Sequence, residues 1–222
     1  MDALFGRSEA HGTVIEHILV VCTGNICRSP FGEITLRSKL ADTGISVSSA
    51  GVYAMEGYGV DPGMIPELTA RGLSPEGFTA HQITDDDVED ADLILVMSRR
   101  QRRFITEEWP FAAKKTLLLH AVTDLVQAAQ NGSSLSPLAA ALAEDEQPRR
   151  RGRREADADR APALSTATIS AVARRRNSEV PEVEDPYRKD AEVFSRVAAE
   201  IDEAAAVLAD ALISSQQPGA HT

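Results

Sequence analysis

Residues 18–29 of the 222-residue chain read ILVVCTGNICRS, and this stretch organises the rest of the sequence. Residues 18–21 form an uninterrupted apolar run, which is typical of a strand that is buried on both faces. Cys22 ends the run, Arg28 follows after a short loop, and Pro30 favours the first turn of a helix. The stretch therefore predicts a strand, a loop and a helix N-terminus, with a cysteine and an arginine at the two ends of the loop.

A loop of this kind suits a phosphate dianion. A helix N-terminus presents unpaired backbone N–H groups and a partial positive charge. Gly24 and Asn25 tolerate the backbone angles that a tightly curled loop requires, and the Arg28 guanidinium can hold two phosphate oxygens. The same field favours the thiolate form of Cys22, to which Ser29 can donate a hydrogen bond. We expect Cys22 to attack phosphorus and form a phosphocysteine intermediate.

Residues 22–29, CTGNICRS, resemble the signature of the low molecular weight protein tyrosine phosphatases. The resemblance implies an α/β fold of the phosphotyrosine protein phosphatase I type, with a four-stranded parallel sheet, helices on both faces and flavodoxin-like layering. It also implies that the loop binds the phosphate group through Thr23, Gly24, Asn25, Ile26, Cys27 and Ser29. The plainer alternative is a buried cysteine that only packs beside a surface arginine.

The alternation of apolar and helical segments favours the same fold class independently. Strands are predicted at 17–21, 45–50, 93–97 and 116–120, and helices at 30–40, 66–71, 85–90 and 98–108. A C-terminal amphipathic helix is predicted from the helical spacing of Val193, Val197, Ile201, Ala204, Leu208 and Leu212. Strands that alternate with helices pair in parallel, which places the loop after the first strand at the ligand-binding edge of the sheet.

Composition limits the function classes. A net charge of −11, without a basic tract before the loop, argues against general nucleic-acid binding. The only cysteines are Cys22 and Cys27, so a disulfide framework is excluded and a reducing cytoplasm is expected. No apolar run has the length of a membrane span, so we expect no membrane insertion. We also expect no metal or cofactor, and a monomer or weak dimer.

The domain organisation follows from changes in composition. Residues 1–13 are predicted to be a flexible lead, 14–213 a single phosphatase domain, and 214–222 a flexible tail. The family pattern is interrupted between 121 and 180, where short helices are predicted at 124–130 and 136–143. Residues 144–164 are rich in charge and poor in apolar side chains, which predicts disorder. The arginines between 149 and 154 are either a solvated linker or a docking site for an acidic partner.

The second half of the chemistry needs an acid, because the leaving oxygen must be protonated. In the family, the aspartate of a late Asp-Pro-aromatic sequence supplies this proton and later activates water. Asp185-Pro186-Tyr187 matches that sequence, so the resemblance assigns Asp185 as general acid and base and places Tyr187 beside the substrate ring.

The resemblance implies further site residues. It places Ser49 behind Asn25, although an ordinary strand-end serine is an equal alternative. It makes the segment 52–62 one wall of the cleft, with Met55 at the position that often carries an aromatic residue or leucine. Tyr53 and Tyr58 are candidates for the same wall, and simple loop packing is the alternative for this segment.

The run DPYRK at 185–189 is closest to the bacterial branch associated with capsule and exopolysaccharide synthesis. This resemblance implies a phosphotyrosine protein as substrate, with a bacterial tyrosine kinase as the partner. The chain also departs from the family: Phe78 replaces a histidine that supports the loop asparagine in relatives, His81 stands where arginine is usual, and Ser98 stands where an acidic residue is usual. These changes leave the stiffness of the loop open.

Two other function classes compete. An arsenate reductase shares this fold and a similar loop, but it needs a thiol relay and no cysteine follows Cys27, so a small-molecule thiol would have to substitute. A non-catalytic phosphotyrosine-binding module needs no acid, yet Cys22, Arg28 and Asp185 are all present.

Overall fold

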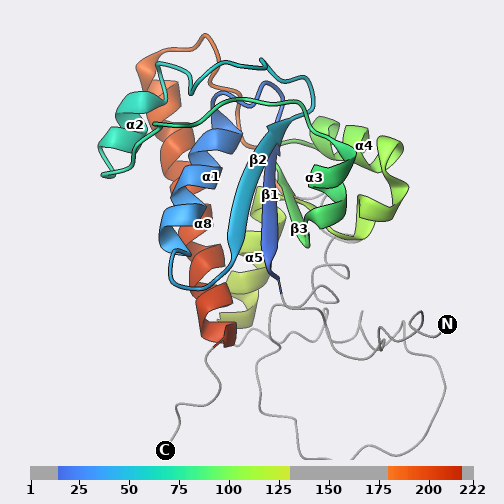
Figure 1. Cartoon of the computed structure of the whole chain (residues 1–222). Coiled ribbons are helices and arrows are strands. Elements are labelled where there is room, and N and C mark those ends of the chain that lie inside the picture. Colours follow the sequence, from blue (N-terminus) through green and yellow to red (C-terminus); the bar gives the residue numbers. More distant parts are fainter. Residues whose placement is uncertain (1–14, 131–179, 217–222) are drawn as a thin grey trace, which may run out of the picture.

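The computed structural model describes residues 15–130 and 180–216, and within these ranges the chain forms a parallel four-stranded sheet. Its order is β2-β1-β3-β4 (Figure 1). The strands are β1 His17–Cys22, β2 Ser46–Gly51, β3 Leu93–Val96 and β4 Thr116–Leu118. The fold class predicted from the sequence is therefore confirmed.

Helices cover both faces of this sheet (Figure 1). On one face lie α1 Arg28–Lys39, α5 Leu119–Gln130 and α8 Ala191–Gln216. On the other lie α3 Asp85–Asp90 and α4 Arg99–Glu108, and the short helices α2 Ile65–Thr69 and η1 Pro110–Lys114 lie in the connections. Because both faces are covered, every side chain from Ile18 to Val21 is at most 1% exposed.

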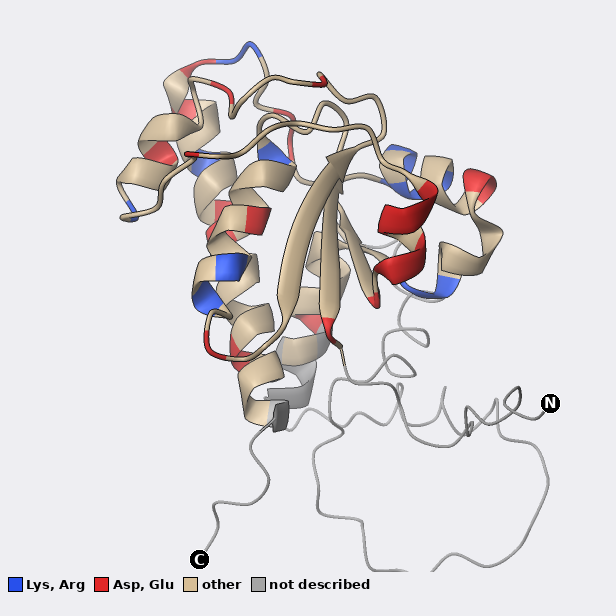
Figure 2. Cartoon of the chain, in the orientation of Figure 1, with Lys and Arg blue, Asp and Glu red and all other residues tan. Residues whose placement is uncertain are grey.

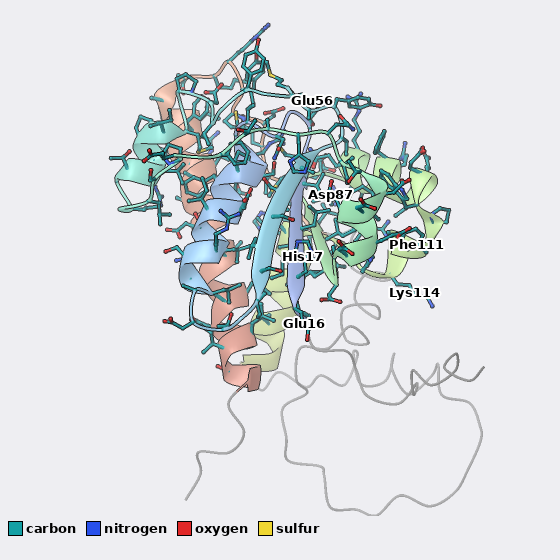
Figure 3. All side chains as sticks on the ribbon, viewed as in Figure 1. Glu16, His17, Glu56, Asp87, Phe111 and Lys114 are labelled. Carbon is teal, nitrogen blue, oxygen red and sulfur yellow. The ribbon has the colours of Figure 1, made fainter. Side chains whose placement is uncertain are left out.

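The sheet fixes the place of the candidate site. β1 is a central strand that pairs with β2 and β3, and its carboxyl end carries the 23–27 loop into α1. Glu16 and His17 mark the opposite end of β1 (Figure 3), where both backbone N–H groups donate to the Asp92 carboxylate at 2.8 and 3.0 Å. The site is thus held at the ligand-binding edge that parallel sheets provide.

The predicted C-terminal helix is confirmed as α8, and its apolar positions face the core. Val197, Ile201 and Leu208 are buried to 1% exposure or less, and Val193 packs against the core while remaining partly exposed. Gly63 allows the segment before α2 to approach this helix, since a Cβ there would lie 2.6 Å from the Phe194 ring. α8 continues to Gln216, so residues 214–216 of the predicted tail are helical, and 217–222 lie outside the described residues.

Two predicted boundaries were wrong for local reasons. The first helix begins at Arg28 and not at Pro30, because the loop turns directly into the helix. The fourth strand ends at Leu118 and not at His120, because α5 begins at Leu119. His120 is therefore helical, and its Nε2 lies 2.6 Å from the Glu200 carboxylate of α8.

The start of the predicted insertion belongs to the core. Ala121, Val122 and Val126 of α5 are buried, so this part of the predicted insertion packs with the domain. The predicted helix at 136–143, the predicted disorder at 144–164 and the lead at 1–13 lie outside the described residues. Within the described ranges, no helix is long and apolar enough to cross a membrane.

Charge is unevenly spread over the helices. Figure 2 shows acidic side chains gathered on α3 and basic side chains on α4. A capping box stands at the start of α3, with Thr84 Oγ1 accepting from the Asp87 N–H while the Asp87 carboxylate accepts from the Thr84 N–H. The three aspartates of the first turn also favour this helix, because acidic groups stabilise a helix N-terminus.

Candidate active site

Cys22 is the last residue of β1, and the fold presents its sulfur to the start of α1. The Ser29 hydroxyl, in the first turn of α1, donates to Cys22 Sγ at 3.0 Å. Cys22 and Ser29 are both buried, so this hydrogen bond is shielded from water. The predicted contact between serine and nucleophile is therefore present.

The loop between Cys22 and Arg28 is curled so that its carbonyl groups bond outward. The carbonyl oxygens of Cys22, Thr23, Gly24 and Ile26 accept, at 2.8–3.0 Å, from the N–H groups of Val52, Tyr53, Met55 and Asp61. The backbone N–H groups of residues 24–27 have no hydrogen-bond partner among the described residues. A curled loop with free N–H groups at a helix N-terminus is an anion-binding nest.

Asn25 holds the loop in this shape. Its φ is 54°, in the left-handed region that asparagine tolerates better than most residues. Its Nδ2 donates to Ser29 Oγ and to Ser49 Oγ, both at 2.9 Å, and its Oδ1 accepts from the His81 backbone N–H at 3.0 Å. The predicted position of Ser49 behind Asn25 is thus what the structure has.

The same contacts show how Asn25 is supported although Phe78 stands in place of the histidine found in relatives. The support for the Asn25 amide oxygen comes from the backbone of His81, so it does not require a histidine side chain at 78. Phe78 is half-buried and packs against the core, and the His81 imidazole lies 3.4 Å from the Asp87 carboxylate. The substitution therefore leaves Asn25 with a full set of partners.

Gln101 is a site residue that the sequence analysis missed. Its Oε1 accepts from the N–H groups of Met97 and Ser98 at 2.9 and 3.0 Å, and its Nε2 donates to Thr23 Oγ1 at 3.1 Å. The side chain ties the catalytic loop to the end of β3, beside the position where Ser98 replaces an acidic residue. The sequence signal was available, because Ser98 and Gln101 form a capping box at the start of α4.

Arg28 and Asp185 meet although they lie near opposite ends of the chain. Arg28 Nη2 is 2.9 Å from Asp185 Oδ2, and Nη1 donates to the Val183 carbonyl at 3.2 Å. The Arg28 side chain is 5% exposed and that of Asp185 is 54% exposed, so the arginine forms the floor and the aspartate the rim. Arg28 Nε is buried without a partner in the described part of the chain, which leaves one charged donor free for an oxyanion.

These residues surround a cavity of about 180 Å³. Its lining consists of Cys22, Thr23, Gly24, Ile26, Cys27, Arg28, Tyr53, Met55, Asp185 and Tyr187. Tyr53 packs edge-on against Phe104 with ring centroids 5.4 Å apart, and the Arg188 guanidinium lies 5.0 Å from the Tyr187 ring centre. Tyr58 is not part of the lining and is 61% exposed, so its prediction as a cleft residue was wrong.

The sequence profile described as "low molecular weight phosphotyrosine protein phosphatase" matches residues 17–134, more than half of the chain. The chain belongs to this family. A relative from Ralstonia solanacearum, the probable low molecular weight protein-tyrosine-phosphatase EpsP, is 44% identical over 97 residues. That alignment covers 44% of this chain and 66% of the relative, so the chain spans just under two thirds of that relative's length.

Solved structures agree with the family assignment. The tyrosine phosphatase AmsI from Erwinia amylovora superposes with a TM-score of 0.60 at 26% identity, over 91% of this chain and 96% of AmsI. The YwlE arginine phosphatase from Geobacillus stearothermophilus gives a TM-score of 0.64 at 22% identity, over 93% of this chain and 99% of YwlE. The second likeness concerns the fold alone.

The two cysteines of this phosphatase-family loop differ in their surroundings. Burial, and after it the Asp61 carboxylate, raise the pKa of the Cys27 thiol, which therefore stays protonated near neutral pH. Cys22 instead receives the Ser29 hydrogen bond. The described residues contain no group of three or more histidine, cysteine, aspartate or glutamate side chains placed to hold a metal ion.

Proposed function

We propose that this protein hydrolyses phosphotyrosine through a phosphocysteine intermediate on Cys22. The observation that carries the proposal is the set of unpaired donors around one sulfur: the N–H groups of residues 24–27 and Arg28 Nε. Donors already fixed in place stabilise negative charge on a phosphoryl group at little reorganisation cost. Cys22 is the nucleophile, Arg28 the phosphate clamp and Asp185 the general acid and base.

In the first step the Cys22 thiolate attacks phosphorus and the bond from phosphorus to the tyrosine oxygen breaks. Asp185, at the rim of the cleft, gives its proton to the departing oxygen. In the second step the Asp185 carboxylate takes a proton from water, the water oxygen bonds to phosphorus and the S–P bond breaks. The hydrogen bond from Ser29 stabilises the thiolate that leaves.

The walls of the cleft support an aromatic ester as substrate. Tyr53, Met55 and Tyr187 border the cavity above the loop and offer apolar surface to a phenyl ring. The resemblance to the exopolysaccharide branch favours a bacterial tyrosine kinase as the protein partner and the cytoplasm as the place where this protein acts. The enzyme works as a monomer or weak dimer without nucleic acid.

The competing functions lack a supporting feature. An arsenate reductase needs a resolving thiol, and the only other cysteine, Cys27, is buried with a raised pKa. A module that only binds phosphotyrosine has no use for a carboxylate paired with the clamp, as Asp185 is.

The test is phosphate release from one peptide prepared with phosphotyrosine, phosphoserine or phosphoarginine. We expect turnover with phosphotyrosine well above the other two, and none with Cys22→Ser. Turnover fastest with phosphoarginine or phosphoserine contradicts the substrate class, and binding without turnover supports the non-catalytic alternative. Thiol-dependent arsenate reduction that exceeds phosphatase activity supports the reductase.

A further inference from the structure

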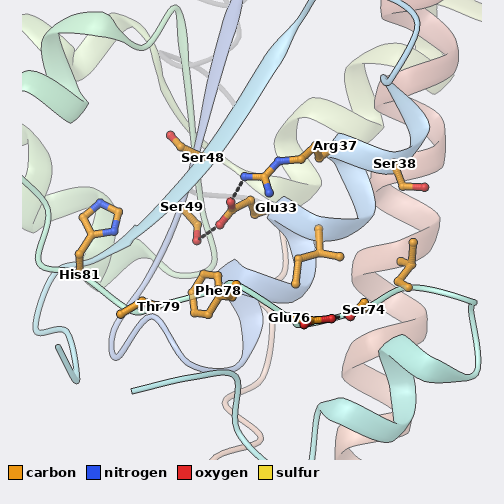
Figure 4. Close-up of a pocket in the computed structure, with 13 residues that line it drawn as sticks. Glu33, Arg37, Ser38, Ser48, Ser49, Ser74, Glu76, Phe78, Thr79 and His81 are labelled. Atoms are coloured by element: carbon orange, nitrogen blue, oxygen red, sulfur yellow. Dashed lines mark hydrogen bonds and ion pairs between the residues drawn. The ribbon is translucent and has the colours of Figure 1, made fainter. Parts of the chain in front are cut away.

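Glu33 is a buried carboxylate that the proposed reaction does not use. It lies on α1, is 6% exposed, and accepts from the Ser49 hydroxyl at 2.6 Å and from the Arg37 guanidinium (Figure 4). Burying a charged group costs free energy unless it is well paired. The buried Glu33 carboxylate beside Ser49 is therefore a candidate for a role in the site.

Glu33 borders a cavity of about 530 Å³ on the far side of the catalytic loop, between α1, the edge strand β2 and the segment 73–81 (Figure 4). The charged or titratable groups around it are Arg37 on its own helix and Glu76 and His81 from the covering segment. Burial raises the pKa of Glu33, while the Ser49 hydrogen bond and the Arg37 charge lower it. Burial is the largest of these contributions, so the pKa of Glu33 lies above its ordinary value. The Ser49 and Arg37 contacts stabilise the charged form that prevails above that pKa.

A series of hydrogen bonds links Glu33 to Cys22 through Ser49, Asn25 and Ser29. Only one assignment of donors and acceptors satisfies all of them. A charged Glu33 can only accept, so it takes the single Ser49 proton, and Ser49 Oγ must then accept from Asn25 Nδ2. The orientation of the Asn25 amide is fixed because its oxygen accepts from the His81 N–H.

The second N–H of the same amide goes to Ser29, which leaves the Ser29 proton free. The nearest acceptors for that proton are Cys22 Sγ at 3.0 Å and the Ala50 carbonyl at 3.5 Å. The shorter distance favours the sulfur.

We propose that Glu33, held by Arg37, is a positioning residue for Cys22. It takes the Ser49 proton, so Ser49 Oγ accepts from Asn25 Nδ2 and, together with the His81 N–H, holds the Asn25 amide in the orientation that leaves the Ser29 proton for the sulfur. It touches neither substrate nor sulfur and acts through the chain of side chains. The proposal rests on the phosphatase function, because the value of the Ser29 hydrogen bond lies in stabilising the Cys22 thiolate.

The partners of Glu33 make Glu33→Gln a sharp test. A glutamine must either turn its NH₂ toward the Arg37 guanidinium, donor against donor, or turn it toward Ser49 and leave the Ser49 proton without its acceptor. The Arg37 guanidinium opposes the first arrangement, and the second reverses the hydrogen bond at Ser49. Removing the guanidinium as well, in Glu33→Gln with Arg37→Met, lets the glutamine oxygen face Ser49 again. The double variant should therefore recover the activity and the Cys22 reactivity that Glu33→Gln loses.

The experiment compares wild type, Glu33→Gln, the double variant and Glu76→Gln. Glu76 is a carboxylate of the same cavity that takes no part in the hydrogen bonds between Glu33 and Cys22. Two readouts are used: kcat on an aryl phosphate, and the pH dependence of Cys22 alkylation by iodoacetamide followed by peptide mapping. We expect Glu33→Gln to lower kcat by about tenfold, equivalent to ~1.4 kcal/mol, and to move Cys22 alkylation to higher pH. Glu76→Gln should match wild type in both readouts.

Recovery of kcat and of the alkylation profile in the double variant supports the proposal, since a purely structural loss would grow when a second partner is removed. A Glu33→Gln variant that matches wild type in both readouts overturns it, and so does a double variant worse than the single one. Circular dichroism and urea unfolding check that each variant is folded. An inactive wild type whose Cys22 alkylation still responds to Glu33→Gln would count against the phosphatase function and not against the positioning role.

Discussion

Arg28 Nη2 and Asp185 Oδ2 lie 2.9 Å apart, so the residues proposed as phosphate clamp and general acid are joined by an ion pair at the mouth of the cleft. The pairing holds the 183–187 segment over the loop, because Arg28 also donates to the Val183 carbonyl. In the proposed reaction, Arg28 holds the phosphate while it lies beside the carboxyl group that delivers the proton. The two roles are therefore coupled, and each can be tested separately.

Asp185→Asn should slow hydrolysis of phosphotyrosine by about 10²–10⁴-fold, the usual contribution of a general acid–base group. Formation of the intermediate from esters with very acidic leaving groups should be nearly unaffected, because those groups leave without a proton. The measurement is the burst rate against leaving-group pKa. Glu184→Gln is the matched control, since that neighbouring carboxylate pairs with Arg196. Equal losses for all leaving groups would show that Asp185 is not the acid.

Arg28→Lys should lower kcat/KM by about 10²–10³-fold, because an ammonium cannot supply the paired donors that hold a phosphoryl group. The buried Nε and the contact with Val183 are both lost in the lysine variant. Arg71→Lys is the control, as Arg71 makes ion pairs with Glu67 and Asp202 away from the cleft. Comparable activity of the two variants would remove Arg28 from the clamp role.

Gly51→Ala should destabilise the fold by about 1–3 kcal/mol, as overpacking of a core does. A Cβ at this position would lie 2.7 Å from the Thr23 carbonyl and 2.9 Å from Ala54 Cα, and backbone atoms cannot move aside cheaply. Because Thr23 belongs to the catalytic loop, kcat should fall as well. The control is Gly59→Ala, where a Cβ meets nothing within 4 Å. Thermal unfolding measures the difference, and equal unfolding midpoints for Gly51→Ala and Gly59→Ala would contradict this packing.

The pH dependence of stability tests the charge state of Glu33. Burial raises its pKa in the folded state, so the folded protein binds the proton more tightly than the unfolded chain does. The stability that Glu33 contributes is full below its unfolded pKa of about 4.3 and is lost as pH rises through its folded pKa. Relative to Glu33→Gln, the wild type should therefore become less stable as pH increases above that value. Urea unfolding at a series of pH values measures this difference, and an opposite slope would mean that Arg37 outweighs burial.

The part of the site that lies close together in sequence could be predicted. The contact between Cys22 and Ser29, the left-handed angle at Asn25 and the helix after the loop all follow from residues 18–30. Asp185 was assigned through the family resemblance, from an Asp-Pro-Tyr sequence just before the last helix, and its role stays a prediction. What the sequence could not show is that Asp185 would be paired with Arg28.

The missed residues act through contacts between distant segments. Gln101 reaches Thr23, Glu33 reaches Ser49, and the backbone of His81 reaches Asn25, and no periodicity or short motif encodes such pairs. The His81 contact uses a main-chain N–H, which is why the sequence left open what the residue at Phe78 means for the loop. The end of β4 was missed because the sequence LLLHAV at 117–122, apolar except for His120, fits a strand and a buried helix equally well.

The measurement that tests the central claim most directly is the capture of a phosphorylated Cys22. In Asp185→Asn, an aryl phosphate with a very acidic leaving group still forms the intermediate, but the carboxylate that activates water is gone. Rapid denaturation at alkaline pH during turnover, followed by peptide mapping, should find one phosphoryl group on the peptide that contains Cys22, and none after Cys22→Ser. A burst of phenol release without any phosphorylated Cys22, or a phosphoryl group on another residue, would contradict the mechanism.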